Sequence, residues 1–428
     1  GCKVNSYETE AMTQLLKKAG YEIVSFQDQA DVYIINTCSV TNMADRKSRQ
    51  MLHKAKKQNP NAVVVATGCY VQTATEKVAQ DLSIDLVVGN NRKKDIVEIL
   101  NEYYAEKEAG EQVKEEYVID INHTDEYEDL EISTVTEHTR AHLKIQDGCN
   151  NFCSYCIIPY ARGRIRSRTM ESIKAELERL STSGFKEIVL TGINLSCYDD
   201  NGKKLIDVIE MADNVNGIER IRLGSLDPEV VTEDFVERLG KVKKICPHFH
   251  FSLQSGCDKT LKAMNRHYTS DEYYEKCQLI RKYINNPAFT TDVIVGFPGE
   301  TEEDYISSRE FVKKVKSAEL HVFKYSKRDG TVAAKMPNQI DEKIKTLRSE
   351  DVIKTGEELT KKFRQAKIGQ DTTVLFEEKI LLDNKEYWVG HTVDYIKIAV
   401  PEKENLEGQI RKVNVKDFLT NEIMLATM

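Results

Sequence analysis

The sequence lacks two features that would place it in or across a membrane. No run approaches the roughly twenty apolar residues that a membrane-spanning helix needs. The N-terminus also lacks the basic-then-apolar pattern of a signal peptide, which indicates a cytoplasmic protein without a membrane partner. The ten cysteines of such a chain are expected to be reduced thiols or metal ligands rather than disulfides. Because the chain starts at Gly1 rather than Met, we expect a trimmed version of a longer protein.

Positive charge is scarce overall, but the deficit is local. The formal net charge is −8, yet residues 102–131 alone contain twelve Asp and Glu against Lys107 and Lys114. The rest of the chain therefore carries a charge of +2. A run of one sign is typical of a solvated linker. Binding to nucleic acid is thus permitted, although the composition does not demand it.

The chain divides into regions of different pattern. In the first, 1–101, a helix over 8–19 and apolar strand runs at 32–35, 62–66 and 85–88 predict a parallel sheet covered by helices. An acidic linker, 102–135, follows, and its first residues are expected to form the end of a helix. The second region, 136–366, ends in a charged helix over 341–367. The third, 367–428, has short strands without helices between them, which predicts a small β-barrel.

The second region contains six strand candidates separated by helical stretches. The expected strands are 142–146, 187–190, 220–223, 248–253, 291–295 and 320–325. Six such βα units predict a partial or complete barrel, an α/β fold with its chemistry at the carboxyl ends of the strands.

Three cysteines, Cys149, Cys153 and Cys156, form a C-x3-C-x2-C run. Four cysteines close a 4Fe-4S cluster, so three would leave one iron open for another ligand. A structural zinc site would need a fourth donor, and neither Cys nor His occurs in the next forty residues. His142, which precedes the run, keeps a non-catalytic zinc RNA-binding module as the alternative.

A second set of cysteines is widely spaced. Cys38 and Cys69 each closely follow a predicted strand, and Cys2 precedes the first helix. Parallel strands place their carboxyl ends on one edge of a sheet, where ligands bind in open α/β folds. The three thiols are therefore candidates for a second 4Fe-4S cluster, against the alternative of ordinary buried cysteines.

Several motifs, in this order along the chain, together resemble the methylthiotransferase family of radical S-adenosylmethionine (SAM) enzymes. These motifs are Gly1-Cys2-Lys3-Val4-Asn5, Asn36-Thr37-Cys38-Ser39-Val40-Thr41, Thr67-Gly68-Cys69-Tyr70 and the cysteine run continued through Ile157-Ile158-Pro159-Tyr160-Ala161-Arg162-Gly163. The resemblance implies an N-terminal three-cysteine domain, a radical SAM partial (βα)6 barrel and a C-terminal TRAM β-barrel. It also implies a transferase with two 4Fe-4S clusters: Cys149, Cys153 and Cys156 would hold the one that binds SAM, and Cys2, Cys38 and Cys69 the one that carries the sulfur.

Within this family, the local residues most resemble the subgroup that acts on N6-threonylcarbamoyladenosine at tRNA position 37. The resemblance implies insertion of a methylthio group at C2 of that base. The alternatives are N6-isopentenyladenosine 37 and an aspartate of a ribosomal protein. The expected partners are tRNA and an electron donor such as flavodoxin or ferredoxin, with the enzyme as a monomer.

Candidate SAM contacts come from the ends of the barrel strands, which are small or polar. We expect Ser225, Gln254 and Gly296 to contact SAM, because glycine admits close backbone approach and polar side chains bind its polar groups. Arg162 begins a row of arginines at every second residue through 168. In an extended chain these would form a stripe for phosphate or the SAM carboxylate, with a solvated strand face as the alternative.

Overall fold

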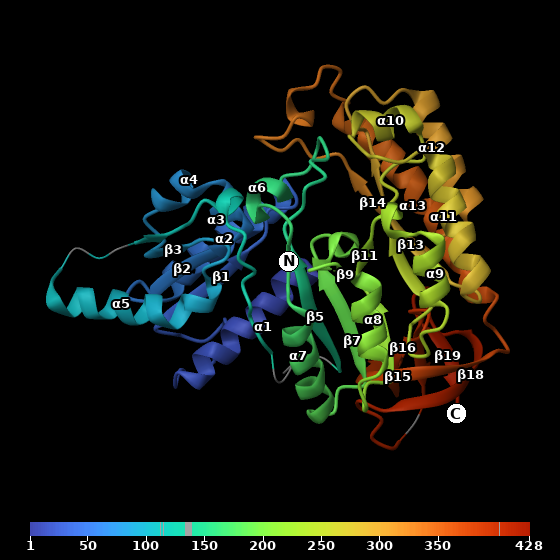
Figure 1. Ribbon diagram of the computed structural model, residues 1–428, viewed down its shortest axis with the longest axis horizontal. Helices are drawn as coiled ribbons and strands as arrows, with labels where there is room; N and C mark the ends of the chain where they lie inside the picture. The colour runs from blue at the N-terminus through green and yellow to red at the C-terminus, as the bar shows by residue number, and fades with distance from the viewer. Residues whose placement is uncertain (112, 114, 133–138, 402) are drawn as a thin grey trace.

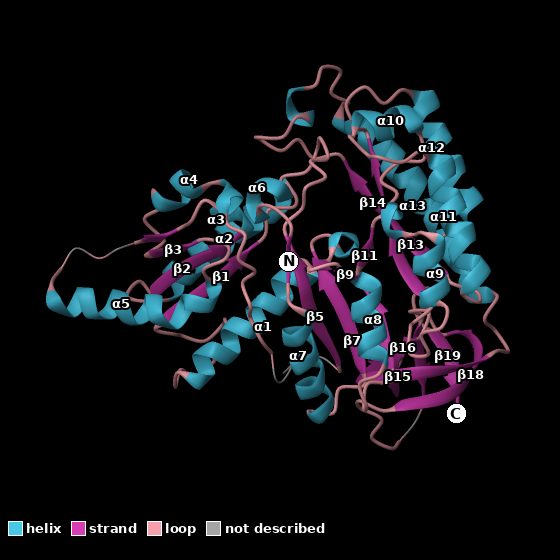
Figure 2. Ribbon diagram, viewed as in Figure 1, coloured by secondary structure: helices cyan, strands magenta, loops and turns pink. Residues whose placement is uncertain are grey.

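The computed structural model describes residues 1–428 except 112, 114, 133–138 and 402. Three units follow one another along the chain, from blue through green to red in Figure 1. The first is an open parallel sheet, the second a partial barrel and the third a small closed barrel (Figure 2). This confirms the α/β architecture predicted from the sequence.

The first unit is a four-stranded parallel sheet in the order β1-β2-β3-β4. Its strands are β1 (Val32–Thr37), β2 (Val63–Gly68), β3 (Leu86–Val88) and β4 (Glu116–Tyr117). One face packs against α1 (Lys3–Lys18) and α5 (Ile96–Ala109). The other packs against α2 (Asn42–Gln58), α3 (Cys69–Thr73) and α4 (Thr75–Ala79). Both faces are apolar because helices cover each of them.

Two boundaries of the first unit differ from expectation. Helix α1 begins at Lys3 rather than at residue 8, because Cys2 caps it and its Sγ accepts a hydrogen bond from Asn5 N at 3.5 Å. The acidic segment begins as the end of a helix, as expected, since α5 continues to Ala109. It differs from a linker further on, where β4 pairs with β3 and so belongs to the first sheet.

The second unit is built from two four-stranded sheets, β10-β7-β5-β6 and β11-β12-β13-β14. They adjoin where β10 leads into β11, and all neighbours are parallel except the edge strand β6. The strands are β5 (Arg140–Asp147), β6 (Arg166–Ser167), β7 (Glu187–Gly192), β10 (Arg220–Leu223), β11 (Ser225–Leu226), β12 (His248–Phe251), β13 (Ala288–Val295) and β14 (Glu319–Lys324). A short hairpin, β8 (Asp199–Asp200) and β9 (Lys203–Lys204), lies outside these sheets.

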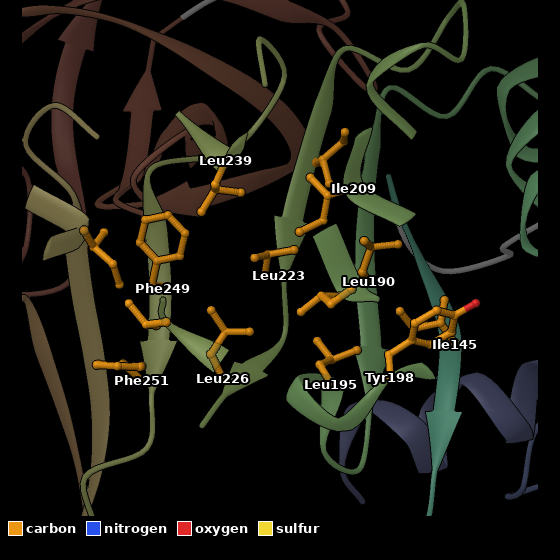
Figure 3. Close-up of a cluster of buried hydrophobic side chains, with 14 of the residues drawn as sticks. Ile145, Leu190, Leu195, Tyr198, Ile209, Leu223, Leu226, Leu239, Phe249 and Phe251 are labelled. Atoms are coloured by element: carbon orange, nitrogen blue, oxygen red, sulfur yellow. The ribbon is translucent and has the colours of Figure 1, made fainter. Parts of the chain in front are cut away.

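Helices cover the outside of this partial barrel (Figure 1). They are α7 (Met170–Thr182), α8 (Leu205–Asp213), α9 (Glu233–Leu239), α10 (Asp258–Ala263), α11 (Ser270–Tyr283), α12 (Glu302–Val315) and α13 (Glu342–Gln365). The short helix α6 (Ile158–Arg162) lies instead beside α3 of the first unit (Figure 1). The main core lies between strands and helices, where Leu190, Leu223, Phe249 and Phe251 meet Ile209 and other helix residues (Figure 3). Because side chains alternate along a strand, the residues between these face the lumen of the barrel.

The third unit is a closed barrel with the order β15-β16-β17-β19-β18. Its strands are β15 (Asp371–Leu382), β16 (Lys385–Thr392), β17 (Lys397–Val400), β18 (Ile410–Phe418) and β19 (Met424–Thr427). Two arginines of β10 dock it on the partial barrel: Arg220 donates to the carbonyl of His391 at 3.0 Å, and Arg222 to that of Val393 at 3.0 Å. None of the described helices is both long and apolar enough to cross a bilayer.

Candidate active site

The three clustered cysteines lie at the carboxyl end of β5 and share one cavity. Cys149, Cys153 and Cys156 all line it, and its volume is about 320 Å³. The turn into this loop requires glycine: Gly148 has φ +74°, and a Cβ there would lie 1.8 Å from the carbonyl oxygen of Arg164. The loop is closed by a hydrogen bond from Cys149 N to Gly163 O at 3.1 Å.

The donors in this loop fit an iron–sulfur cube. Polar groups approach the sulfurs: Arg266 Nη1 lies 3.2 Å from Cys153 Sγ, and Asn194 Nδ2 lies 3.9 Å from Cys149 Sγ. No three of the described His, Cys, Asp and Glu side chains close on a single ion; a cube does not need this, since each thiolate binds its own iron at a separate corner. Burial raises the pKa of Cys156 to about 12, so iron must displace its proton on binding.

Ser225 and Gln254, both expected to contact SAM, line the same cavity. Gln254 has φ +69°, an uncommon backbone conformation for a residue other than glycine. It is held there because its N–H donates to Asp292 O at 2.9 Å and its carbonyl accepts from Ile294 N at 2.8 Å. The cavity therefore offers amide, hydroxyl and carboxylate groups to a ligand with amino, carboxylate and ribose functions.

The other two expected SAM contacts lie elsewhere. Gly296 is absent from the residues that line the cavity. Its φ is +71°, and a Cβ there would lie 2.3 Å from Lys345 Cγ, so this glycine allows α13 to approach. Its N–H donates to Glu300 Oε1 at 2.8 Å. Arg162 is buried between the first unit and the barrel, as described below.

Cys2, Cys38 and Cys69 meet at the carboxyl edge of the first sheet. Thr37 pairs with Gly68 at the ends of β1 and β2, so the following residues, Cys38 and Cys69, are neighbours. Asn5 brings the start of α1 to the same place, since its side-chain amide donates to Asn36 O at 3.2 Å. The structure thus brings these three thiols together.

Arg162 joins this edge to the barrel. Its Nε donates to Cys69 Sγ at 3.1 Å, and its Nη2 to Glu8 Oε2 at 3.0 Å. Desolvation raises the pKa of the Cys2 thiol, while the positive charge of Arg162 opposes that rise. Asp147, two residues before Cys149, lies 3.3 Å from Arg162 Nη1.

The expected stripe of arginines is therefore internal rather than exposed. Arg162, Arg166 and Arg168 are almost fully buried, and Arg164 stacks 4.6 Å from the ring centre of Phe152. The buried partners form a network: Lys93 and Lys144 lie 3.0 and 2.9 Å from Glu8, Lys144 lies 2.6 Å from Asp147, and Arg168 pairs with Glu176. The alternation of the arginines is visible in the sequence, but the acidic side chains that surround them are visible only in the structure.

The cavity wall is completed by the first unit. Val40 and Thr41, which follow Cys38, line it together with Arg328 from the loop after β14. Arg328 holds the two units together, since it donates to Ser39 Oγ at 2.7 Å and pairs with Asp45 at 2.9 Å. The segment that follows Cys38 therefore forms part of the wall of the cavity that holds Cys149, Cys153 and Cys156.

Sequence reasoning missed Arg266 and Asp227 as parts of this site. Arg266 Nη2 lies 2.6 Å from Asp227 Oδ2, and both residues line the cavity. Neither belongs to a motif, and only the convergence of β11 and the turn after α10 brings them together.

Comparison with known proteins defines the class. Residues 143–312 match the model of the radical SAM superfamily, and residues 1–89 match that of the uncharacterized protein family UPF0004. Among solved structures, the radical SAM methyltransferase TsrM of Kitasatospora setae superposes with a TM-score of 0.57 at 16% identity, over 74% of this chain and 69% of that one. That likeness supports the fold alone. The three-cysteine loop in a partial barrel is thus that of a radical SAM enzyme, a class that uses a 4Fe-4S cluster and SAM.

Curated relatives narrow the class. The threonylcarbamoyladenosine tRNA methylthiotransferases MtaB of Bacillus subtilis and Aquifex aeolicus are 41% and 39% identical to this chain. The alignments cover 97% and 90% of this chain and 92% and 93% of theirs. A tRNA-2-methylthio-N(6)-dimethylallyladenosine synthase of Clostridium botulinum is 35% identical over 88% of this chain and 84% of its own. The chain belongs to the radical SAM methylthiotransferase family and is a tRNA methylthiotransferase, which excludes the zinc module as its function.

Proposed function

We propose that this enzyme inserts a methylthio group at C2 of N6-threonylcarbamoyladenosine 37 in tRNA. The observation that carries the proposal is the set of relatives: those named for threonylcarbamoyladenosine reach 41% and 39% identity, against 35% for the synthases named for dimethylallyladenosine. Methylthiolation of N6-isopentenyladenosine 37 is the second candidate, because the latter relatives also cover most of the chain.

The same proposal assigns Cys2, Cys38 and Cys69 to a second 4Fe-4S cluster that holds the sulfur. Three thiols at one sheet edge, with Arg162 donating to one of them, support this assignment. An sp2 C–H bond resists acid–base side chains, so bound clusters and SAM supply the radical chemistry and the sulfur.

In this proposal, side chains of the protein bind SAM and orient a cysteine ligand of the second cluster. Ser225 and Gln254 contact SAM, and Asp292, on the same wall, is placed to accept hydrogen bonds from its amino or ribose groups. Val40 and Thr41 close the cavity and reduce the access of water to it. Arg162 orients the Cys69 thiolate and neutralises part of its charge.

The proposed partners follow from this chemistry. The enzyme acts as a cytoplasmic monomer on tRNA whose adenosine 37 already carries the threonylcarbamoyl group. It draws electrons from a small donor such as flavodoxin or ferredoxin, because reductive cleavage of SAM consumes an electron that no side chain supplies.

Mass spectrometry of tRNA nucleosides tests the substrate. In a strain that lacks this gene, 2-methylthio-N6-threonylcarbamoyladenosine is expected to disappear and N6-threonylcarbamoyladenosine to accumulate, and a plasmid copy is expected to reverse both changes. Loss of 2-methylthio-N6-isopentenyladenosine instead would support the second candidate. A plasmid copy with Cys153→Ala is the control, and it is expected not to restore the methylthiolated nucleoside.

A further inference from the structure

A second and larger cavity occupies the amino-terminal end of the barrel lumen. Its volume is about 800 Å³, and it opens between the barrel and the C-terminal unit. Its wall is polar, with four histidines, His142, His248, His250 and His321, three cations, Lys3, Arg140 and Arg222, and four glutamates, Glu319, Glu377, Glu378 and Glu407. We call it the lower chamber.

The cavity lined by Cys149, Cys153 and Cys156 is called the SAM cavity below. The lower chamber and the SAM cavity are successive parts of the barrel lumen. Along and just beyond β12, His248 and His250 line the chamber, and Ser252 and Gln254 line the SAM cavity. Asp292 of the SAM cavity lies 3.3 Å from His250 of the chamber. Because every second residue of a strand faces the same side, one step of about 6.6 Å leads from one cavity to the other.

One wall of the lower chamber is basic and incompletely paired. Lys3 lies next to Cys2; it forms no ion pair within the part of the chain that the structure describes, and Asp292 acts on its charge only from a longer distance. His248 is 6% exposed, and neither of its ring nitrogens has a hydrogen-bond partner among the described residues. Burial lowers the pKa of His248 well below its usual range, with Arg222 and Lys3 adding to the shift, so it is neutral near pH 7 and has one N–H to donate.

Two of the four acids of the chamber, Glu377 and Glu378, are paired with basic side chains. Glu377 lies 3.3 Å from Arg140 Nε and 2.9 Å from His391 Nδ1, and Glu378 lies 3.5 Å from Lys397. These glutamates come from β15 of the C-terminal barrel. The lower chamber therefore has acids on the side of the C-terminal barrel, while its cations come from α1 (Lys3), β5 (Arg140) and β10 (Arg222).

We infer that the lower chamber binds the carboxylate of the substrate's N6-threonylcarbamoyl group, with Lys3 as its cation and His248 as a hydrogen-bond donor. This inference rests on the function proposed above. From N6 to that carboxylate the group spans about five covalent bonds, roughly 6 Å, which matches one step along the lumen, from the level of Ser252 to that of His250, and His248 lies one step further on the same face. A base held beside SAM in the upper cavity thus extends its substituent into the chamber.

The same arrangement disfavours an isopentenyl group. An apolar substituent would leave Lys3 and the His248 N–H without partners and would remove water from both, which costs free energy. Lys3 and His248 are thus specificity-determining residues rather than catalytic ones.

Binding of RNA by the iron-loaded enzyme tests the inference. The probes are two anticodon stem-loops that differ only in whether adenosine 37 is plain or carries the threonylcarbamoyl group. We expect the wild type to bind the modified loop at least about tenfold more tightly, because a charge-assisted hydrogen bond contributes roughly 1.5–3 kcal/mol. Lys3→Gln and, separately, His248→Gln are expected to reduce that ratio severalfold, while Lys3→Arg retains most of it.

Controls separate the possible failures. Lys17→Gln, at the other end of the same helix, is expected to keep the ratio, and iron content checks that the change at Lys3 has not disturbed Cys2. The chamber assignment is wrong if Lys3→Gln and His248→Gln both keep the wild-type ratio of affinities. It is also wrong if they reduce the affinity for both RNAs equally, as the loss of a phosphate contact would. No preference in the wild type itself would instead contradict the proposed substrate.

Discussion

Arg162 Nε lies 3.1 Å from Cys69 Sγ, so a residue of the radical SAM barrel donates to a thiol of the N-terminal sheet. The other edge of the same guanidinium pairs with Glu8, which itself lies on α1 of the first unit. One side chain therefore ties together the barrel, the first helix and the proposed second cluster.

Arg162→Lys is expected to lower the reduction potential of the second cluster. Lysine keeps the charge but lacks the planar fork, so it cannot serve Cys69 and Glu8 together, and hydrogen bonds to cluster sulfur raise the potential. The measurement is a redox titration followed by electron paramagnetic resonance in a Cys153→Ala background, which leaves only this cluster. Arg164→Lys, whose side chain stacks on Phe152, serves as the matched control. An unchanged potential in Arg162→Lys would mean that this hydrogen bond does not tune the cluster.

Cys38→Ala is expected to reduce iron from roughly eight to about four atoms per chain, because only the first cluster would remain. Methylthiolation is expected to be lost, while reductive cleavage of SAM to 5′-deoxyadenosine continues. Cys197→Ala, outside both sets of ligands, is the control and should keep all the iron. If Cys38→Ala also retains eight irons, the assignment of the second set of cysteines is wrong.

Gln254→Gly is expected to weaken SAM binding about tenfold without harming the fold. The side chain lines the SAM cavity, and its backbone φ of +69° costs a non-glycine residue on the order of 1 kcal/mol, which glycine avoids. The free energy of unfolding is therefore expected to stay level or rise by up to about 1 kcal/mol. Calorimetric titration with SAM and urea unfolding measure the two effects. If this variant binds SAM with wild-type affinity, Gln254 is not part of the SAM-binding site.

Acid is expected to destabilise the protein through Glu8 and Asp147. The cations around Glu8 hold the pKa of that carboxyl well below its usual range in spite of burial, and Lys144 and Arg162 likewise lower the pKa of Asp147 to about 2. Since both folded-state pKa values lie below the unfolded ones, their contribution to stability is complete above about pH 4.5 and is lost as the pH falls through the folded values.

Glu8→Gln tests this origin. The variant leaves Lys93, Lys144 and Arg162 short of one negative charge, so its free energy of unfolding at pH 7 is expected to fall by about 3–5 kcal/mol. Between pH 5 and pH 3, its stability is expected to change less steeply than that of the wild type. Urea unfolding across this range measures both, with the exposed Glu98→Gln as control. Equal slopes in the two variants would place the acid sensitivity elsewhere.

The architecture and the cysteine loop could be predicted from the sequence because both depend on local patterns. Alternating helix and strand signals predicted the sheets, and the spacing of Cys149, Cys153 and Cys156 survives in any backbone conformation. Arg162 was expected at SAM, but the structure places it against Cys69 and Glu8. Its position depends on Glu8 and Asp147, which no local pattern connects to it.

The lower chamber could not be foreseen for a related reason. Its wall joins Lys3 of the first helix, residues of six strands of the partial barrel, and Tyr395 of the C-terminal unit, whose ring stacks on His248 at 4.9 Å. None of these side chains belongs to a recognisable motif in its own segment of the sequence. Only the docking of three units makes them neighbours.

The clamp that Arg328 makes with Ser39 and Asp45 has a consequence for protein engineering. A chimera that exchanges the N-terminal unit between two methylthiotransferases would also exchange one wall of the SAM cavity. Such a transplant into this enzyme preserves the wall only if the incoming unit supplies a hydroxyl and a carboxylate where Ser39 and Asp45 meet Arg328. These three residues therefore define the side-chain match that an exchanged N-terminal unit must provide.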